Sequence, residues 1–121
     1  MRPVKLGPKG VGRMSFQEFW PRYLDAHRDP RTRMFHVAGT IAGTALAAAA
    51  VATRRPWLAA AALVAGYGPA WFSHAFIERN RPETFRAPFS SLAADYIMAW
   101  HVLRGTIDRQ MSGEREEEPQ P

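Results

Sequence analysis

Four histidines are the residues of this sequence best suited to chemistry near neutral pH. They are His27, His36, His74 and His101. Neutral imidazole is a common metal ligand and proton carrier. His74 and Glu78 are four residues apart, so they share one face of a helix. The sequence has no Cys, which excludes disulfides, thiolate metal sites and Cys nucleophiles.

Two long uncharged runs in the middle of the chain are the elements that must position these residues. Residues 34–53 and 56–77 carry no formal charge if the histidines are neutral, and Arg54 and Arg55 form the turn between them. Each run is long enough to cross about 30 Å of hydrocarbon at about 1.5 Å per residue. The pattern predicts an all-α fold built on a membrane helical hairpin. Because Ala and Gly dominate both runs, a shallow or re-entrant hairpin and a soluble Ala-rich hairpin remain alternatives.

Small residues also predict how the two helices pack. Gly39 and Gly43 form a GxxxG element, and Gly66 and Ala70 offer a small surface on the second run. Such rows let two helix backbones approach closely in lipid.

Two amphipathic helices are predicted to flank the hairpin, at about 16–27 and about 91–111. Ser15 and Glu18 form a capping box before the aromatic face of the first helix. Asp29 and Pro30 then restart the chain as N-cap and first helical residue. The apolar stripe of the last helix favours a position along the hairpin base or the membrane surface.

A hairpin brings its two ends together, and this predicts a site. His36 lies early in the first run and His74 lies near the end of the second, while His27 enters from the preceding turn. Three imidazoles and the carboxylate of Glu78 would then meet at the mouth of the hairpin. Such a set suits a redox-active divalent metal such as Fe(II), with open positions for a substrate. His101 is predicted to face solvent, opposite the apolar stripe of its helix.

Charge predicts orientation and excludes one class of partner. The net charge is +5, and 14 of the 16 basic residues are Arg. Seven arginines flank the hairpin and two lie in its turn, so the positive-inside rule places both termini in the cytoplasm. The arginines flank apolar runs and no nucleic-acid-binding motif is present, which argues against DNA or RNA as a partner.

The ends of the chain differ from its middle. Residues 1–14 form a basic arm and residues 112–121 an acidic tail, and both are predicted to be disordered. Residues 15–111 are predicted to form a single helical membrane domain. The predominance of Arg and Ala is typical of a GC-rich bacterial source, so the expected location is the bacterial inner membrane.

Two stretches carry a resemblance to a known family. They are FWPRYLDAHRDPRTRMFHVAGT at 19–40 and WFSHAFIERNRPETFRAPFSSLAADY at 71–96. The shared pattern is a Tyr-containing helix leading to a His, a second His followed by Gly, and a His-x-x-x-Glu element with a basic residue and Pro. With these motifs the chain resembles the 2-hydroxy fatty acid dioxygenase-like family over about 15–105.

The resemblance implies an Fe(II)-dependent dioxygenase that shortens 2-hydroxy fatty acids, or related lipid acids, by one carbon. By this analogy His27, His36 and His74 are the iron ligands, and Glu78 is a fourth ligand or the partner that orients His74. Arg28 and Arg81 are the candidates for pairing with the substrate carboxylate. The implied partners are a lipid bilayer, a fatty-acid-like substrate and dioxygen, and the Gly-rich helix faces also allow a homodimer.

The sequence departs from the family pattern at a few positions. Ser73 stands where Gly is expected, and Thr32 stands where Asn is often found. Glu83 and Thr84 replace the Ala-Leu that tends to follow the last motif. A second class of function therefore stays open: a non-enzymatic membrane scaffold or partner subunit, whose His and Arg residues lie at an interface.

Overall fold

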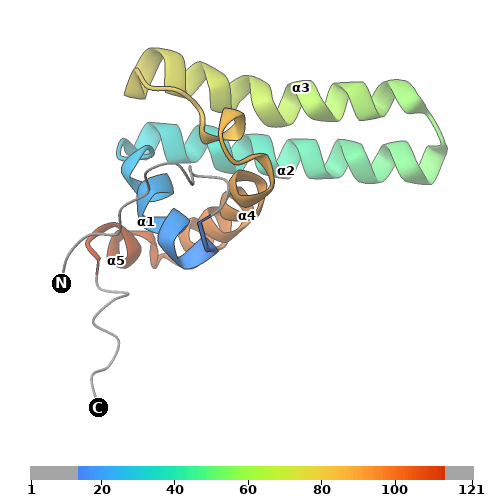
Figure 1. Ribbon diagram of the computed structural model, residues 1–121. Coiled ribbons are helices and arrows are strands. Elements are labelled where there is room, and N and C mark those ends of the chain that lie inside the picture. The colour runs from blue at the N-terminus through green and yellow to red at the C-terminus, as the bar shows by residue number, and fades with distance from the viewer. Residues whose placement is uncertain (1–13, 114–121) are drawn as a thin grey trace.

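A computed structural model describes residues 14–113, and this part of the chain is helical with no strand (Figure 1). The helices are α1 (Phe16–Asp25), α2 (Pro30–Thr53), α3 (Pro56–Ser73), the π-helical segment η3 (His74–Glu78), the 3-10 turn η4 (Glu83–Phe85), α4 (Pro88–Arg104) and α5 (Ile107–Met111). The all-α prediction is confirmed. The predicted disordered ends lie almost wholly outside the described residues.

Helices α2 and α3 run antiparallel, side by side, and extend beyond the rest of the molecule (Figure 1). Glycine permits their close approach. A Cβ atom on Gly39 would lie 2.9 Å from the carbonyl oxygen of Gly66, and one on Gly43 would lie 3.1 Å from that of Ala62. The predicted packing of the GxxxG element against Gly66 is therefore confirmed. The turn closes on Arg54, which adopts left-handed backbone angles with φ 58°.

The predicted membrane hairpin is only partly supported. Among the described helices, α2 alone is long and apolar enough to cross a membrane. Helix α3 has 18 residues, and its sequence includes two Gly, two Pro and a Tyr. These residues lower the mean hydropathy of α3. The structure therefore shows a pair of packed helices, but it does not show that both of them span a membrane.

The remaining helices cluster at the end of the pair where α2 begins and α3 ends (Figure 1). Helix α1 opens with the predicted capping box: the Glu18 amide donates to Ser15 Oγ at 3.1 Å, and the Ser15 amide donates to Glu18 Oε1 at 3.0 Å. Pro21 lies inside α1 without ending it. The aromatic face of α1 then packs against α4, forming a core that contains Phe19, Tyr23, Leu24, Ala94 and Met98.

The predicted helix at about 91–111 is two helices. Gly105 ends α4 with φ 81°, a left-handed conformation that suits Gly at a helix C-terminus, and α5 begins two residues later. The apolar stripe of α4 also faces outward, because Leu92 and Leu103 are exposed while Ala94 and Met98 are buried. His101, which was predicted to face solvent, is half-buried and does not face it fully. Its Nδ1 lies 2.6 Å from Thr106 Oγ1, and its ring lies 6.1 Å from that of Trp20.

Candidate metal centre

His27 is fixed by the C-terminal end of α1. Its amide donates to the carbonyl oxygen of Leu24 at 2.9 Å, which continues the last turn of the helix. The imidazole ring stacks on the ring of Tyr23, with centroids 4.0 Å apart and planes inclined by 24°. The side chain is only 1% exposed. The aromatic face of α1 therefore determines where this histidine lies.

His36 projects from the second turn of α2, and the N-terminus of that helix is capped as the sequence predicts. The Arg31 amide donates to Asp29 Oδ1 at 2.8 Å, and Pro30 is the first helical residue. Arg33 reinforces this start, because its buried guanidinium donates to the carbonyl oxygens of His27 and Arg28 at 2.8 and 2.9 Å.

His74 begins a single π-helical turn, η3, at the end of α3. The Asn80 amide donates to the carbonyl oxygen of His74 at 2.9 Å, and Arg79 closes the turn with left-handed angles, φ 60° and ψ 45°. Positive φ is uncommon for a residue with a Cβ. Single π turns inside helices are frequent at functional sites, because they turn side chains away from the ordinary helical register.

The three imidazoles meet through the same ring atom. His27 Nε2 lies 3.1 Å from His36 Nε2 and 3.1 Å from His74 Nε2. The three ligand atoms all lie within 4.8 Å of one another, and the three side chains are buried. Two nitrogens bound at right angles to one ion at about 2.1 Å would lie about 3.0 Å apart. The two distances from His27 Nε2 match this separation, so the three histidines could hold a metal ion.

The other ring nitrogens decide which atoms carry protons. His27 Nδ1 lies 2.6 Å from the Tyr23 carbonyl oxygen, and His36 Nδ1 lies 2.9 Å from the Thr32 carbonyl oxygen. A carbonyl oxygen only accepts, so each Nδ1 carries a hydrogen and donates it. In the neutral ring, Nε2 then holds a lone pair.

His74 also carries its hydrogen on Nδ1, and here the acceptor is a side-chain amide. Its Nδ1 lies 2.6 Å from Asn80 Oδ1, and Asn80 Nδ2 donates to the carbonyl oxygen of Ala26 at 3.1 Å. The second bond fixes which end of the amide is the oxygen, so His74 Nδ1 is also the donor. Three neutral lone pairs therefore face one another, which is unfavourable without a cation between them. This donor set fits a divalent metal, with each ligand oriented by an oxygen on its other nitrogen.

Electrostatics favours the neutral rings that a metal requires. Burial lowers the pKa of His27 well below its ordinary value, and the neighbouring His36 and His74 lower it further. Burial also lowers the pKa of His74. Metal ions bind the neutral form of imidazole, so no proton needs to be displaced from these two rings near pH 7.

The structure places the other predicted site residues around this triad without joining them to it. Glu78 Oε2 accepts from the Asp29 amide at 2.7 Å, so Glu78 ties η3 to the loop before α2. The contact with His74 Nδ1 belongs to Asn80 instead. Arg28 is exposed and pairs with Asp25 at 2.5 Å, and Arg81 is exposed.

Sequence reasoning missed three residues here. Asn80 orients His74, and Arg33 holds the loop at His27 and Arg28, through the hydrogen bonds described above. Glu83, like Glu78, raises the pKa of His74 through its charge, and the buried Oε1 of Glu83 has no hydrogen-bond partner among the described residues. Asn80 and Glu83 both lie in the second stretch that resembles the family. The resemblance therefore pointed to this segment, but the roles of the two residues depend on tertiary contacts.

Comparison with known proteins agrees with this geometry. A family model described as 2-hydroxy-palmitic acid dioxygenase Mpo1-like matches residues 13–107. The chain belongs to this Mpo1-like family. The matched segment contains the three histidines and Asn80. No curated protein and no solved structure matches the chain.

Proposed function

We propose that this Mpo1-like protein is a membrane-bound, Fe(II)-dependent dioxygenase that shortens 2-hydroxy fatty acids by one carbon. One observation carries the proposal: three buried histidines point neutral Nε2 lone pairs at a common centre. The family description supports the reaction class and the type of substrate. Iron bound there would supply the activation of dioxygen.

The overall reaction is balanced without a further reductant. A 2-hydroxy acid and dioxygen give the acid one carbon shorter, carbon dioxide and water. The 2-carbon and the carboxyl carbon together lose four electrons, which is the number that dioxygen accepts. The bond broken is the one between these two carbons.

The residues of the chain hold and shield the site. His27, His36 and His74 would hold the metal, and three protein ligands would leave coordination positions free for a substrate and dioxygen. We assign Arg28 and Arg81, which follow His27 and η3 in the chain, to the substrate carboxylate, because a guanidinium binds a carboxylate bidentately. Glu78 holds the two loops together and so supports both arginines.

Membrane binding is supported by the outer surface of the helices. Large apolar side chains are exposed on each of the long helices: Met34, Ile41 and Val51 on α2, Val64 and Phe72 on α3, and Trp100 and Leu103 on α4. Apolar surface of this extent marks a membrane or protein interface. We place α2 and α3 in the bacterial inner membrane, with both termini in the cytoplasm.

Oxygen consumption tests the proposal. Protein purified in detergent without oxygen and loaded with Fe(II) should consume dioxygen on addition of 2-hydroxypalmitate and release pentadecanoate, detected by mass spectrometry. Palmitate, which lacks the hydroxyl group, should give neither signal, and nor should the His36→Ala variant with 2-hydroxypalmitate. Iron-loaded protein that leaves 2-hydroxy acids unchanged would favour a non-enzymatic membrane scaffold.

A further inference from the structure

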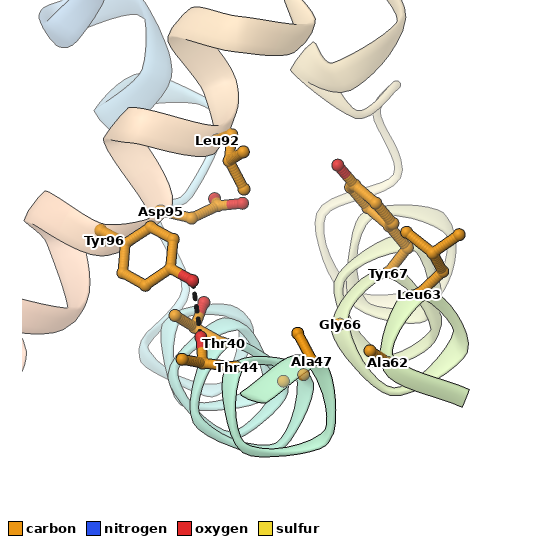
Figure 2. A pocket seen from close by; sticks show the side chains of 12 residues that line it. Thr40, Thr44, Ala47, Ala62, Leu63, Gly66, Tyr67, Leu92, Asp95 and Tyr96 are labelled. Carbon is orange, nitrogen blue, oxygen red and sulfur yellow. Dashed lines mark hydrogen bonds between the residues drawn. The ribbon is translucent and has the colours of Figure 1, made fainter. Parts of the chain in front are cut away.

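A pocket lies between α2, α3 and α4, and its volume is about 200 Å³ (Figure 2). Its walls are formed by α2 from Gly39 to Ala47, by α3 from Ala62 to Tyr67, and by Leu92, Asp95 and Tyr96 of α4. None of the three histidines lines it.

The pocket is hollow because its lining residues are small. Gly39, Gly43 and Gly66 let the backbones of α2 and α3 come together, and Ala47 and Ala62 extend the same surface. No large side chain from α2 enters the space (Figure 2). Small residues allow the helix backbones to pack, and they also leave room for a slender apolar ligand.

Some of the polar atoms of the pocket are paired within the protein. Tyr96 Oη lies 2.5 Å from Thr44 Oγ1, and Asp95 accepts from Tyr23 Oη at 2.5 Å. Figure 2 shows the Tyr96 contact on one side of the space and Leu63 on the other. Most of the lining surface is nonetheless apolar, which favours an apolar ligand.

On α2, the residues that line the pocket follow His36 on the same face of the helix, in the next turns. Gly39 and Thr40 lie one turn beyond His36 on α2. Asp95 of the pocket is connected to the metal centre through Tyr23, which donates to Asp95 and stacks on the ring of His27. From His36 to Ala47 the helix rises about 16 Å at about 1.5 Å per residue.

The pocket also borders the apolar outer surface. Leu63 and Leu92 line it and are 61% and 45% exposed. A ligand held in lipid could therefore enter sideways between α3 and α4, without crossing a charged surface.

We infer that this pocket holds the alkyl chain of the substrate, with the acid end at the three histidines, and that Ala47 limits the chain length. The inference rests on the proposed function. The occupant follows from the location: the lining on α2 begins one turn beyond His36, continues along the helix to Ala47, is mostly apolar, and borders the exposed apolar surface. Ala47 is the lining residue of α2 farthest from His36, so a larger side chain there shortens the space.

Two neighbouring alanines give a matched test. Ala47 lines the pocket, whereas Ala48 does not, and both are exposed on α2. Protein loaded with Co(II) reports chelation by a 2-hydroxy acid through its visible absorption, so affinity can be measured without turnover. Ala47→Leu should weaken binding of 2-hydroxypalmitate about tenfold and leave that of 2-hydroxyoctanoate within about twofold, since the shorter chain ends before position 47. Ala48→Leu should change neither.

A second pair of variants, on α3, separates an effect on the pocket from an effect on folding. Ala62→Leu narrows the pocket from α3, and Ala60→Leu places the same side chain outside the lining, with thermal unfolding measured for all four variants. Equal losses for both chain lengths, or no loss in Ala47→Leu and Ala62→Leu, would overturn the pocket assignment. If no 2-hydroxy acid perturbs the wild-type Co(II) spectrum, the proposed substrate class fails instead.

Discussion

Asn80 illustrates how a residue outside the triad sets the properties of a ligand. Its amide oxygen accepts from His74 Nδ1, and its amide nitrogen donates to Ala26. Asn80→Ala removes the acceptor and frees the ring to rotate and to exchange tautomers. Loss of such a partner typically weakens metal affinity about 10- to 100-fold. We expect a loss in this range for Co(II), measured by competition with a chelator.

Arg81→Ala is the control for this variant. Arg81 is the exposed neighbour of Asn80, and it contacts none of the three histidines that would bind the metal. Its Co(II) affinity should match that of the wild type. Equal affinity in Asn80→Ala and the wild type would show that the ring orientation of His74 does not depend on the amide.

The buried histidines also predict a pH dependence of the metal-free protein. The folded-state pKa of His27 and that of His74 are lowered, so below about pH 6.5 the unfolded chain binds more protons than the folded one. Stability is therefore full above about pH 6.5 and falls as the pH decreases toward 5. Thermal unfolding of chelator-treated protein in detergent, recorded between these values and pH 8, measures this slope.

Asp95 acts in the opposite direction and allows the two effects to be separated. Burial raises its folded-state pKa to about 6, so its contribution is largest in acid and is lost as the pH rises through 6. Asp95→Asn removes this opposing contribution, and the loss of stability on acidification should become steeper. A pH slope that stays the same in Asp95→Asn would contradict the raised pKa.

At the residue scale, the sequence predicted which histidines meet but not how they are held. His27, His36 and His74 follow from the hairpin, since its two ends must coincide. Their partners depend on tertiary contacts: Asn80 reaches the Ala26 carbonyl across 54 positions, and Glu78 reaches Asp29 across 49. Spacing alone favoured Glu78 for His74, because the π turn that presents Asn80 has no simple sequence signal.

Among the elements, the α2–α3 pair depends on close glycine contacts, of which that of Gly39 is the tightest. A Cβ at position 39 would lie 2.9 Å from the backbone oxygen of Gly66, so Gly39→Ala must push the helices apart. Overpacking of this kind costs about 1–3 kcal/mol. We expect a lower thermal unfolding temperature and a weaker metal site, because His36 lies one turn away.

Gly68→Ala provides the comparison for the glycine variant. A Cβ at position 68 meets nothing within 4 Å, so the better helix propensity of Ala should leave stability equal or slightly higher. Similar unfolding temperatures for Gly39→Ala and Gly68→Ala would mean that α2 and α3 can separate freely.

Helix boundaries were predictable wherever a local signal sets them. Ser15 and Asp29 cap their helices as expected, and α2 starts at the predicted Pro30 and ends at 53, where the first uncharged run ends. The last helix was predicted as one element because its apolar pattern continues past Gly105. A single Gly inside such a pattern is ambiguous, and here it ends α4.

For the whole molecule, the outward-facing apolar residues are the basis of the proposed membrane location. Ile41 is 54% exposed on α2, the one described helix that is apolar enough to span a membrane. Ile41→Arg would place a charge against hydrocarbon at a cost of about 3 kcal/mol, while leaving the metal centre untouched. We expect a marked loss of protein from the membrane fraction after an alkaline wash.

Arg55→Ala, in the turn between α2 and α3, is the matching control and should remain in the membrane. If the wild type and Ile41→Arg both accumulate as soluble, metal-binding protein, the membrane assignment is wrong. The apolar surface would then belong to a protein interface.

The most direct test of the metal centre is the metal content of the purified protein. Elemental analysis on protein handled without oxygen should give close to one iron per chain in the wild type and almost none in His74→Ala. His101→Ala should retain the iron, because His101 pairs with Thr106 outside the triad. Wild-type protein without metal after Fe(II) reconstitution, or equal iron in His74→Ala and His101→Ala, would contradict the account.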